Sequence, residues 1–325
     1  MVDVRLPGPL RAALDQMPAQ GRETARRAAG LSAAYRTMQP SATTVVEAAD
    51  VGAYLATRLP ATFAATATVL GEAARRLPEF APRSMLDAGA GPGTASWAAV
   101  ELFPNLGTIT MLDHGAAMLA TAGELAAHSP LATLNRAERV AGSLVRPPFG
   151  DRRFDLVVAS YALTELADAR VGEAALALWG RCDGALVLVE PGRPRDYQRL
   201  MAVRAALVAA GARIAAPCPH ERPCPLPEGD WCHFSVRLPR SRAHMQAKGA
   251  TLGYEDEKFS YLVVARQAVV VAPPGGRLVR PPLVRKFEAV LPLCTAAGLE
   301  DRVVRRRDAA AFKAARNLEW GDAVD

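Results

Sequence analysis

The sequence predicts an α/β fold organised around a doubly wound, parallel sheet. A short apolar strand at 84–87 runs into the glycine-rich turn AGAGPGT and then into a helix, SWAAVELF. A second strand at 108–112 ends at Asp113, and further strands alternate with helical segments. A strand, a glycine-rich turn and a helix form the opening unit of a nucleotide-binding sheet, and the alternation favours parallel pairing. The later strands are expected at 139–141, 154–160 and 184–190.

The N-terminal region, residues 1–80, is expected to be helical. Its Ala-rich segments at 21–38 and 60–77 place apolar residues at helical spacing. Pro40 and Pro60 interrupt the pattern. Since no catalytic grouping stands out here, we expect a helical cap or docking surface in front of the sheet domain.

The glycine-rich turn supplies the cofactor candidates. Gly89, Gly91 and Gly93 let the backbone turn tightly and approach a ligand closely. Asp113 stands at the end of the second strand, where an acid holds ribose hydroxyls in such folds. NAD-binding turns usually space their glycines as GxGxxG, which differs from the GxGxG found here.

The string LDAGAGPGT, together with Asp113 and FDLVVAS, resembles the class I methyltransferases that bind S-adenosylmethionine. That resemblance implies that Asp87 contacts the methionine end of the cofactor and adds Ser160, at the end of FDLVVAS, to the cofactor-binding set. Gly142 and Ser143 stand where many relatives place an acid near the adenine, so we expect weak affinity.

No catalytic residue can be named from the sequence. Amino-methylating relatives carry an Asn-or-Asp-Pro-Pro-aromatic turn after the fourth strand, whereas residues 159–163 read ASYAL. Tyr161 and Glu165 lie near the expected pocket mouth, where a structural role is the simpler interpretation. Cys182 precedes a strand and is interpreted as a small buried side chain. Whether the protein is an enzyme therefore stays open.

Three of the five cysteines, Cys218, Cys224 and Cys232, lie close together in the sequence. Thiols clustered in a chain without a secretory signal favour a metal over disulfides. A tetrahedral metal ion or an iron–sulfur cluster needs four ligands, so a fourth must come from elsewhere. The spacings are more open than the CxxC pairs of structural zinc sites, although His220 and His233 leave zinc as an alternative.

The tail, residues 267–325, alternates and turns like a small antiparallel meander that ends in a short helix. Cys294 falls in its middle strand, before a turn at 297–298, so a hairpin can carry this thiol back to the other three. We therefore divide the chain into an N-terminal helical region, a sheet domain at 81–266 with a cysteine-rich insertion at about 214–250, and this tail. Before the last strand of the sheet domain, residues 255–257 are interpreted as an acidic turn that is solvated or paired with Arg.

Composition restricts the classes of protein. The chain has 325 residues and a formal net charge of +6, and no apolar run reaches the ~18 residues of a membrane span. It lacks a secretory h-region, and Asp3 and Asp15 argue against a presequence, so a reducing cytosol is expected. Much of the positive charge is Arg, which suits phosphate contacts and makes RNA a reasonable partner. No membrane partner is expected, and a monomer is the default.

One family combines these features. The chain resembles the methyltransferase-like assembly factors of the mitochondrial ribosomal small subunit and their bacterial relatives. The resemblance rests on YLATRLPATFAA, LDAGAGPGTASWAA, CPHERPCPL with WCHF, YEDEKFSYLV, LPLCT and the final WGD. It implies a class I methyltransferase fold, a [4Fe–4S] cluster held by four cysteines, and binding to small-subunit rRNA and 30S assembly intermediates. The ligands carried over by position are Cys218, Cys224, Cys232 and Cys294.

These features leave alternative functions open. The first is an RNA-docking assembly factor in which the pocket and the cluster are structural. The second is an active S-adenosylmethionine-dependent rRNA methyltransferase, which the glycine-rich turn favours and the missing catalytic turn disfavours. A zinc-containing RNA-binding module and a redox-sensing regulator are further alternatives.

Overall fold

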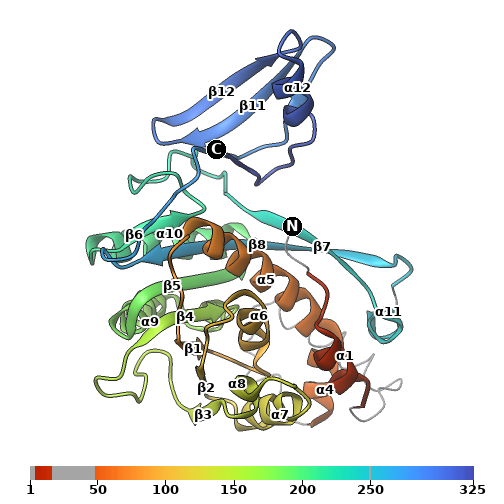
Figure 1. Ribbon diagram of the computed structural model, residues 1–325, viewed down its shortest axis with the longest axis vertical. Coiled ribbons are helices and arrows are strands. Elements are labelled where there is room, and N and C mark those ends of the chain that lie inside the picture. Colours follow the sequence, from red (N-terminus) through yellow and green to blue (C-terminus); the bar gives the residue numbers. More distant parts are fainter. Residues whose placement is uncertain (1–3, 17–47, 249) are drawn as a thin grey trace.

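The computed structural model describes residues 4–16, 48–248 and 250–325 (Figure 1). The predicted helical segment at 21–38 lies outside these residues. Helices precede the first strand in the described part of the N-terminal region, namely α1 (Gly8–Gln16), α4 (Ala48–Thr57) and α5 (Leu59–Arg76). Pro60 falls in the first turn of α5, where its missing N–H is no loss, so this proline begins a helix.

The large sheet has eight strands in the order β3-β2-β1-β4-β5-β8-β6, with β7 paired to β8. Its first five strands are parallel, and β1 lies between β2 and β4, so the chain winds outward in both directions. This is a class I methyltransferase-like α/β fold with a mixed sheet. The strands are β1 (Ser84–Ala88), β2 (Thr108–Asp113), β3 (Glu138–Ala141), β4 (Phe154–Ser160), β5 (Cys182–Pro191), β6 (Arg213–Ala216), β7 (Phe234–Pro239) and β8 (Tyr254–Ala265).

The prediction of a wholly parallel sheet is wrong at one side. β8 runs antiparallel to β5, and both β6 and β7 run antiparallel to β8. β7 leads into β8 through a connection whose described residues contain only the short helix α11, and β8 returns antiparallel to it between β5 and β6. The predicted acidic turn also belongs to this strand: Asp256 pairs with Arg237 of β7, and Glu257 is buried.

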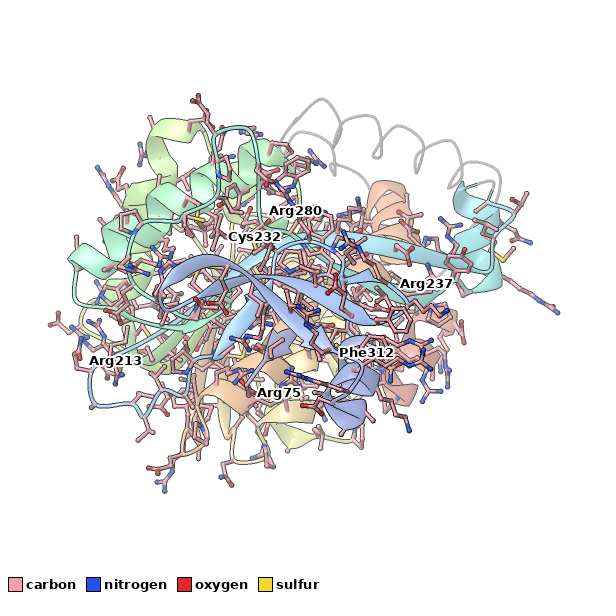
Figure 2. The ribbon with its side chains drawn as sticks, turned by 90° about the horizontal axis from the view of Figure 1, so that it is seen from above. Arg75, Arg213, Cys232, Arg237, Arg280 and Phe312 are labelled. Atoms are coloured by element: carbon pink, nitrogen blue, oxygen red, sulfur yellow. The ribbon has the colours of Figure 1, made fainter. Side chains whose placement is uncertain are left out.

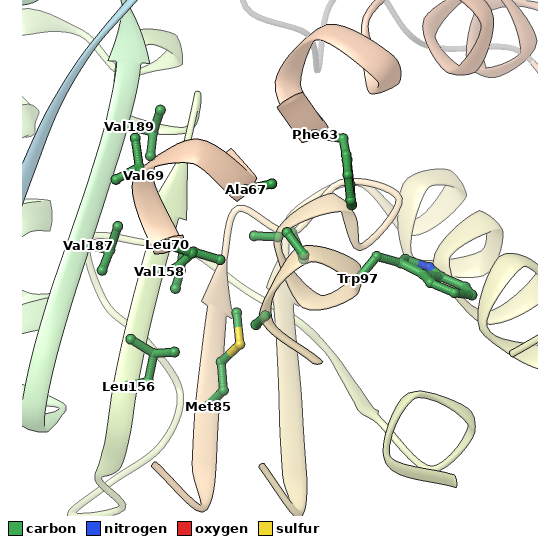
Figure 3. Packing of buried hydrophobic residues seen from close by; sticks show 14 of the residues in the cluster. Phe63, Ala67, Val69, Leu70, Met85, Trp97, Leu156, Val158, Val187 and Val189 are labelled. Atoms are coloured by element: carbon green, nitrogen blue, oxygen red, sulfur yellow. The ribbon is translucent and has the colours of Figure 1, made fainter. Parts of the chain in front are cut away.

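Helices cover both faces of the large sheet. Alternate residues of each strand point to opposite faces, so Met85 and Val158 meet α5 on one face while Leu86 and Val157 join the α9–α10 side on the other. Figure 3 shows the first of these contacts, with Val69 and Leu70 of α5 against the strands. The remaining helices are α6 (Thr94–Leu102), α7 (Ala116–Ala127), α8 (Ala132–Asn135), η1 (Leu163–Glu165), α9 (Asp168–Gly180), α10 (Pro194–Ala209) and α11 (Arg242–Lys248).

The tail forms a second, antiparallel sheet, which we call the C-terminal sheet. It stands at one end of the molecule (Figure 1) with the strand order β10-β11-β9-β13 and β12 paired to β11. Its small core contains Leu278, Leu291, Leu293 and Phe312. The elements are β9 (Gly276–Leu278), β10 (Leu283–Val284), β11 (Glu288–Thr295), β12 (Gly298–Arg305), α12 (Ala309–Ala315) and β13 (Ala323–Val324).

Candidate functional site

The glycine-rich turn joins β1 to α6 and requires glycine for two reasons. Gly89 has φ +75° and Gly93, at the N-terminus of α6, has φ +82°, a backbone conformation that side chains disfavour. In addition, a Cβ at Gly89 would lie 2.4 Å from the Cβ of Ala162, after β4. The turn and the loop after β4 are therefore in direct contact beside Gly89.

Two predicted carboxylates hold the turn in place. Oδ2 of Asp87 accepts hydrogen bonds from the Ser96 backbone N–H (2.9 Å) and hydroxyl (2.7 Å), which ties β1 to the first turn of α6. Asp113 accepts from the Gly91 N–H through Oδ2 (2.8 Å) and from the Gly115 N–H through Oδ1 (2.7 Å). Burial raises the pKa of Asp87 to about 6, and the nearby charge of Asp113 contributes. Each carboxylate thus already bonds to backbone N–H groups beside the predicted pocket.

Arg58, between α4 and α5, and Tyr161, which follows β4, both contact Glu257 of β8. The hydroxyl of Tyr161, which has φ +56°, donates to Oε1 of Glu257 (2.8 Å), and the Arg58 guanidinium lies 3.5 Å from the same carboxylate. Burial raises the pKa of Tyr54 well above its usual value, and the charges of Glu165 and Asp113 add to the shift.

The turn residues and the two carboxylates form one group, whereas Ser160 bonds elsewhere. The Oγ of Ser160 lies 2.7 Å from the Thr66 Oγ1 on α5, which is the helix that covers this face of the sheet. Tyr161 occupies the position of the expected catalytic turn and is paired with Glu257. Ser160 and Tyr161, which stand where amino-methylating relatives carry their catalytic turn, are therefore bonded to α5 and to β8.

All four predicted metal ligands line one cavity. Cys218, Cys224 and Cys232 come from the segment between β6 and β7, and Cys294 comes from β11 of the C-terminal sheet. The cavity is thus at the junction of the two sheets, near the position that Figure 2 labels as Cys232. Cys182 lies elsewhere, buried at the start of β5. The structure brings together the four cysteines that the sequence grouped and leaves out the fifth.

The electrostatics of this cavity favour neutral thiols in the absence of a cation. Burial raises the pKa of Cys294 to about 12 and raises those of Cys218 and Cys232, and the neighbouring thiolates add to each shift. Arg204 and Arg277 act in the opposite direction on these groups. The Tyr197 hydroxyl lies 3.0 Å from the sulfur of Cys224.

The two histidines weighed for a zinc site have other surroundings. The His233 ring stacks on Trp231, with centroids 5.2 Å apart, and lies 4.2 Å from the Trp320 ring. His220 approaches Cys294 with Nε2 at 3.5 Å from the sulfur, but it does not line the cavity. Across the described ranges, no group of three or more His, Cys, Asp or Glu side chains is arranged to hold a metal ion. The metal part of the sequence prediction is therefore not shown by the structure.

Polar contacts join the cysteine segment to the C-terminal sheet. Arg277 of β9 is buried; its Nε donates to the Pro217 carbonyl (3.2 Å) and its Nη2 to Oε1 of Glu72 on α5 (2.7 Å). Arg222 donates to the Ala296 carbonyl in the β11–β12 turn. The cavity wall thus consists of parts of the chain that are bonded to one another.

Sequence reasoning missed Arg277, Glu72, Tyr54 and Arg58. Tyr54 and Arg58 lie in YLATRLPATFAA, one of the strings that supported the family resemblance. Membership of that string was the only indication in the sequence that these two residues belong to the site. Arg277 and Glu72 gave no local signal, because their pairing depends on the position of the C-terminal sheet against α5.

The comparisons with known proteins agree with the sequence resemblance. Residues 48–325 match the family described as mitochondrial small ribosomal subunit Rsm22. The human ribosome assembly protein METTL17, mitochondrial, is 30% identical over 283 residues, which cover 83% of this chain and 61% of the human protein. The Rsm22-cox11 tandem protein 2, mitochondrial, of Schizosaccharomyces pombe is 25% identical over 285 residues, which cover 73% of this chain and 38% of that protein. This chain thus spans only part of the length of these relatives.

Among solved structures, magnesium protoporphyrin IX methyltransferase from Synechocystis, with bound S-adenosylmethionine, is similar. It is 16% identical, with a TM-score of 0.42, and the match covers 64% of this chain and 80% of that chain.

The prediction of a cytosolic compartment is contradicted by these comparisons. The family description and the curated relatives all name mitochondrial proteins. The prediction used the lack of a secretory h-region, which does not separate the cytosol from an organelle, and the acids Asp3 and Asp15, an argument against a presequence that the comparisons overturn. Separately, none of the helices in the described part of the chain has the length and apolar character to cross a bilayer.

Proposed function

Because this chain belongs to the family described as mitochondrial small ribosomal subunit Rsm22, we propose that it is a mitochondrial assembly factor that binds the rRNA of the small ribosomal subunit. The observation that carries the proposal is the family match over residues 48–325, together with 30% identity to a human ribosome assembly protein. The Arg-rich composition supports an RNA partner, because guanidinium groups bind phosphates through paired hydrogen bonds.

The proposal includes a [4Fe–4S] cluster held by Cys218, Cys224, Cys232 and Cys294. The donor set supports it: four thiols line one cavity, and four cysteine thiolates are the usual ligands of such clusters. Zinc held by the same thiols is the weaker alternative, because the cysteine spacings in the sequence are more open than the CxxC pairs of structural zinc sites.

The role proposed for the cluster is to join the two sheets. Three ligands belong to the large-sheet domain and one belongs to β11. When bound, the cluster would supply covalent links between them, in addition to the hydrogen bonds that Arg277 and Arg222 make across the junction. The orientation of the C-terminal sheet would then depend on the cluster.

The region beside the glycine-rich turn is proposed to bind S-adenosylmethionine. Asp87, Gly89, Gly91, Gly93 and Asp113 lie together as binding would require. In the present conformation the Asp113 carboxylate bonds to the Gly91 N–H, so holding ribose hydroxyls would require exchanging that bond. Ser160, the last residue of β4, completes the set, although its hydroxyl now lies 2.7 Å from that of Thr66. Weak affinity is the expected consequence.

Methyl transfer to rRNA is the second candidate function, because the turn and both carboxylates are retained. The pairing of Tyr161 with Glu257 favours the docking role. Tyr161 is the residue that follows β4, and its hydroxyl is already used in a structural hydrogen bond.

Two measurements test the proposed function. Sedimentation of the purified protein with small-subunit precursor particles should place it in the particle fractions, and protein that stays at the top of the gradient would contradict an assembly role. Incubation of those particles with tritiated S-adenosylmethionine should leave the rRNA unlabelled if docking is the function, whereas stoichiometric label would establish the methyltransferase instead.

A further inference from the structure

One end of the C-terminal sheet gathers positive charge. In the β11–β12 pair, Glu288 lies opposite Arg305, so the turn before β11 and the residues after β12 meet at the same end. The Arg306 N–H donates to the Phe287 carbonyl (2.8 Å), which holds the two segments together. We call the cations of this region the basic end; they are Arg285, Lys286, Arg305, Arg306, Arg307, Lys313 and Arg316, and all are exposed.

Little negative charge offsets this group. Glu288 accepts from Arg285 (3.0 Å) and lies 3.4 Å from Arg305, so it is shared between these two side chains. Asp308 accepts from the Ala311 N–H at the start of α12. Within the described residues, the ion pairs of this region leave Lys286, Arg306, Arg307, Lys313 and Arg316 without a carboxylate partner. The basic end therefore carries cations whose counter-charge must come from solution or from a ligand.

The basic end also has a hollow and an exposed aromatic ring. A pocket of about 520 Å³ is lined by Lys286, Arg306, Lys313 and Arg316, with Phe312 at its base. Phe287 is 64% exposed, and the Lys286 ammonium lies 5.1 Å from its ring centre. Cations that follow a hollow, next to a ring available for stacking, are the features by which proteins bind single-stranded nucleic acid.

From these observations we infer that the basic end is an RNA-binding surface, in which the pocket takes backbone phosphates and Phe287 stacks on an unpaired base. The inference rests on the proposed function and assigns the rRNA contact to a surface. A protein partner is less favoured, because five of the eight residues that line the pocket are cations, namely Arg285, Lys286, Arg306, Lys313 and Arg316. An unpaired RNA segment supplies both the phosphates and the base faces that this surface would bind.

The same geometry connects the RNA surface to the cysteine centre. Cys294 and Glu288 lie on β11, roughly 20 Å apart at ~3.4 Å per residue. The end of β11 that carries Cys294 is at the junction with the large sheet, and the other end carries the cations. The proposed cluster would therefore fix the direction in which the RNA surface points without contacting the RNA.

The test compares two variants with equal change of charge. The first is Lys286→Glu/Arg306→Glu/Lys313→Glu, at the basic end. The control is Arg83→Glu/Arg136→Glu/Arg213→Glu, on the large-sheet domain; Figure 2 places Arg213 far from Phe312. Binding of deproteinised small-subunit rRNA and of a short unpaired RNA is measured by fluorescence anisotropy at several salt concentrations.

The basic-end variant should weaken rRNA binding at least tenfold and lower the dependence of log K on log salt by about 2, since each lost contact to single-stranded phosphate removes roughly 0.7. The control variant should change affinity less than threefold. Phe287→Ala should weaken binding of the unpaired RNA roughly five- to 150-fold, the range found for loss of one stacked base, and leave duplex RNA binding unchanged.

Three outcomes decide between the possibilities. If both triple variants lose affinity equally, the basic end is not the RNA surface, although the proposed function stands. If the protein binds precursor particles but not deproteinised rRNA, the inference fails together with the rRNA part of the proposed function, while the assembly role stands. If the wild-type protein binds neither, the proposed function itself fails.

Discussion

Arg277 of β9 donates its Nη2 to Oε1 of Glu72 on α5 at 2.7 Å, across 205 positions of sequence. Both side chains are buried, and Arg76 bonds to the same carboxylate oxygen at 3.1 Å. The pair joins the helix that covers the large sheet to the strand that supports the cysteine cavity. It therefore couples the two sheets through charge, together with the ion pairs of Arg76 with Asp325 and of Arg280 with Asp230.

Removing one partner of this pair should be costly. Arg277→Met leaves the Glu72 carboxylate buried with its main partner gone, and loss of one member of a buried ion pair typically costs about 3–5 kcal/mol. Arg75→Gln is the matched control, because Arg75 bonds to the other oxygen of Glu72 but is 55% exposed, so its loss should cost less than about 1 kcal/mol. Urea unfolding measures both, and equal losses would contradict the central place given to Arg277.

The same pair makes the stability of the fold depend on pH in the acidic range. Burial by itself would raise the pKa of Glu72, but Arg277, with Arg75 and Arg76, outweighs burial and lowers the pKa to about 2. Because the folded pKa is below the unfolded value, the stabilisation is complete above pH ~4.5 and is lost as pH falls toward 2. The lost free energy is on the order of 3 kcal/mol.

Unfolding of metal-free protein between pH 6 and pH 2.5 measures this effect. Glu72→Gln should be less stable at pH 6 and should lose less stability on acidification than the wild type. Parallel curves for the two proteins would show that another group controls the acid response.

Gly89 should tolerate substitution less well than Gly91. Both have positive φ, which costs an alanine about 1–2 kcal/mol, but only at Gly89 would the new methyl group meet a side chain, that of Ala162. Gly89→Ala should lower the free energy of unfolding by roughly a further 1–3 kcal/mol, because the new methyl group overpacks this contact. The double variant Gly89→Ala/Ala162→Gly should recover part of this, and melting curves with no recovery would contradict the contact.

Binding of S-adenosylmethionine should depend on Asp113. Asp113→Asn keeps the shape of the side chain but removes the charge and one acceptor, so calorimetry should show at least a tenfold loss of affinity, about 1.4 kcal/mol. Asp151→Asn, at an exposed position away from the turn, is the control. If both variants bind like the wild type, ribose hydroxyls are not held by Asp113.

Local patterns were sufficient for much of the fold. The turn at 89–93 could be predicted because its glycines need positive φ, and the strands at 84–87 and 154–160 because they are short apolar runs between turns. The strand at 254–265 was misread in part: three consecutive acids suggested a turn, whereas they lie in β8. The predicted pairing with Arg is confirmed for Asp256, which contacts Arg237 of β7, but Glu257 is buried and accepts from Tyr161. Such pairings depend on the order of the strands in the sheet, which a short stretch of sequence does not reveal.

The candidate site likewise has one part that could be predicted from the sequence and one part that could not. Cys294 could be grouped with the other three cysteines because a hairpin strand can return a thiol to a distant loop, and the structure places all four around one cavity. The pairing of Arg277 with Glu72 could not be predicted, because it requires the placement of the C-terminal sheet against α5. Side chains that join separate parts of the chain were the ones that sequence reasoning missed.

The most direct test of the account is iron and sulfide quantitation with an anaerobic absorption spectrum for wild type, Cys294→Ala and Cys182→Ala. The account predicts about four iron and about four sulfide atoms per chain in the wild type and in Cys182→Ala. It predicts loss of both, and of the brown colour, in Cys294→Ala. Full iron and sulfide in Cys294→Ala, or none in anaerobically purified wild type, would contradict a cluster that joins the two sheets.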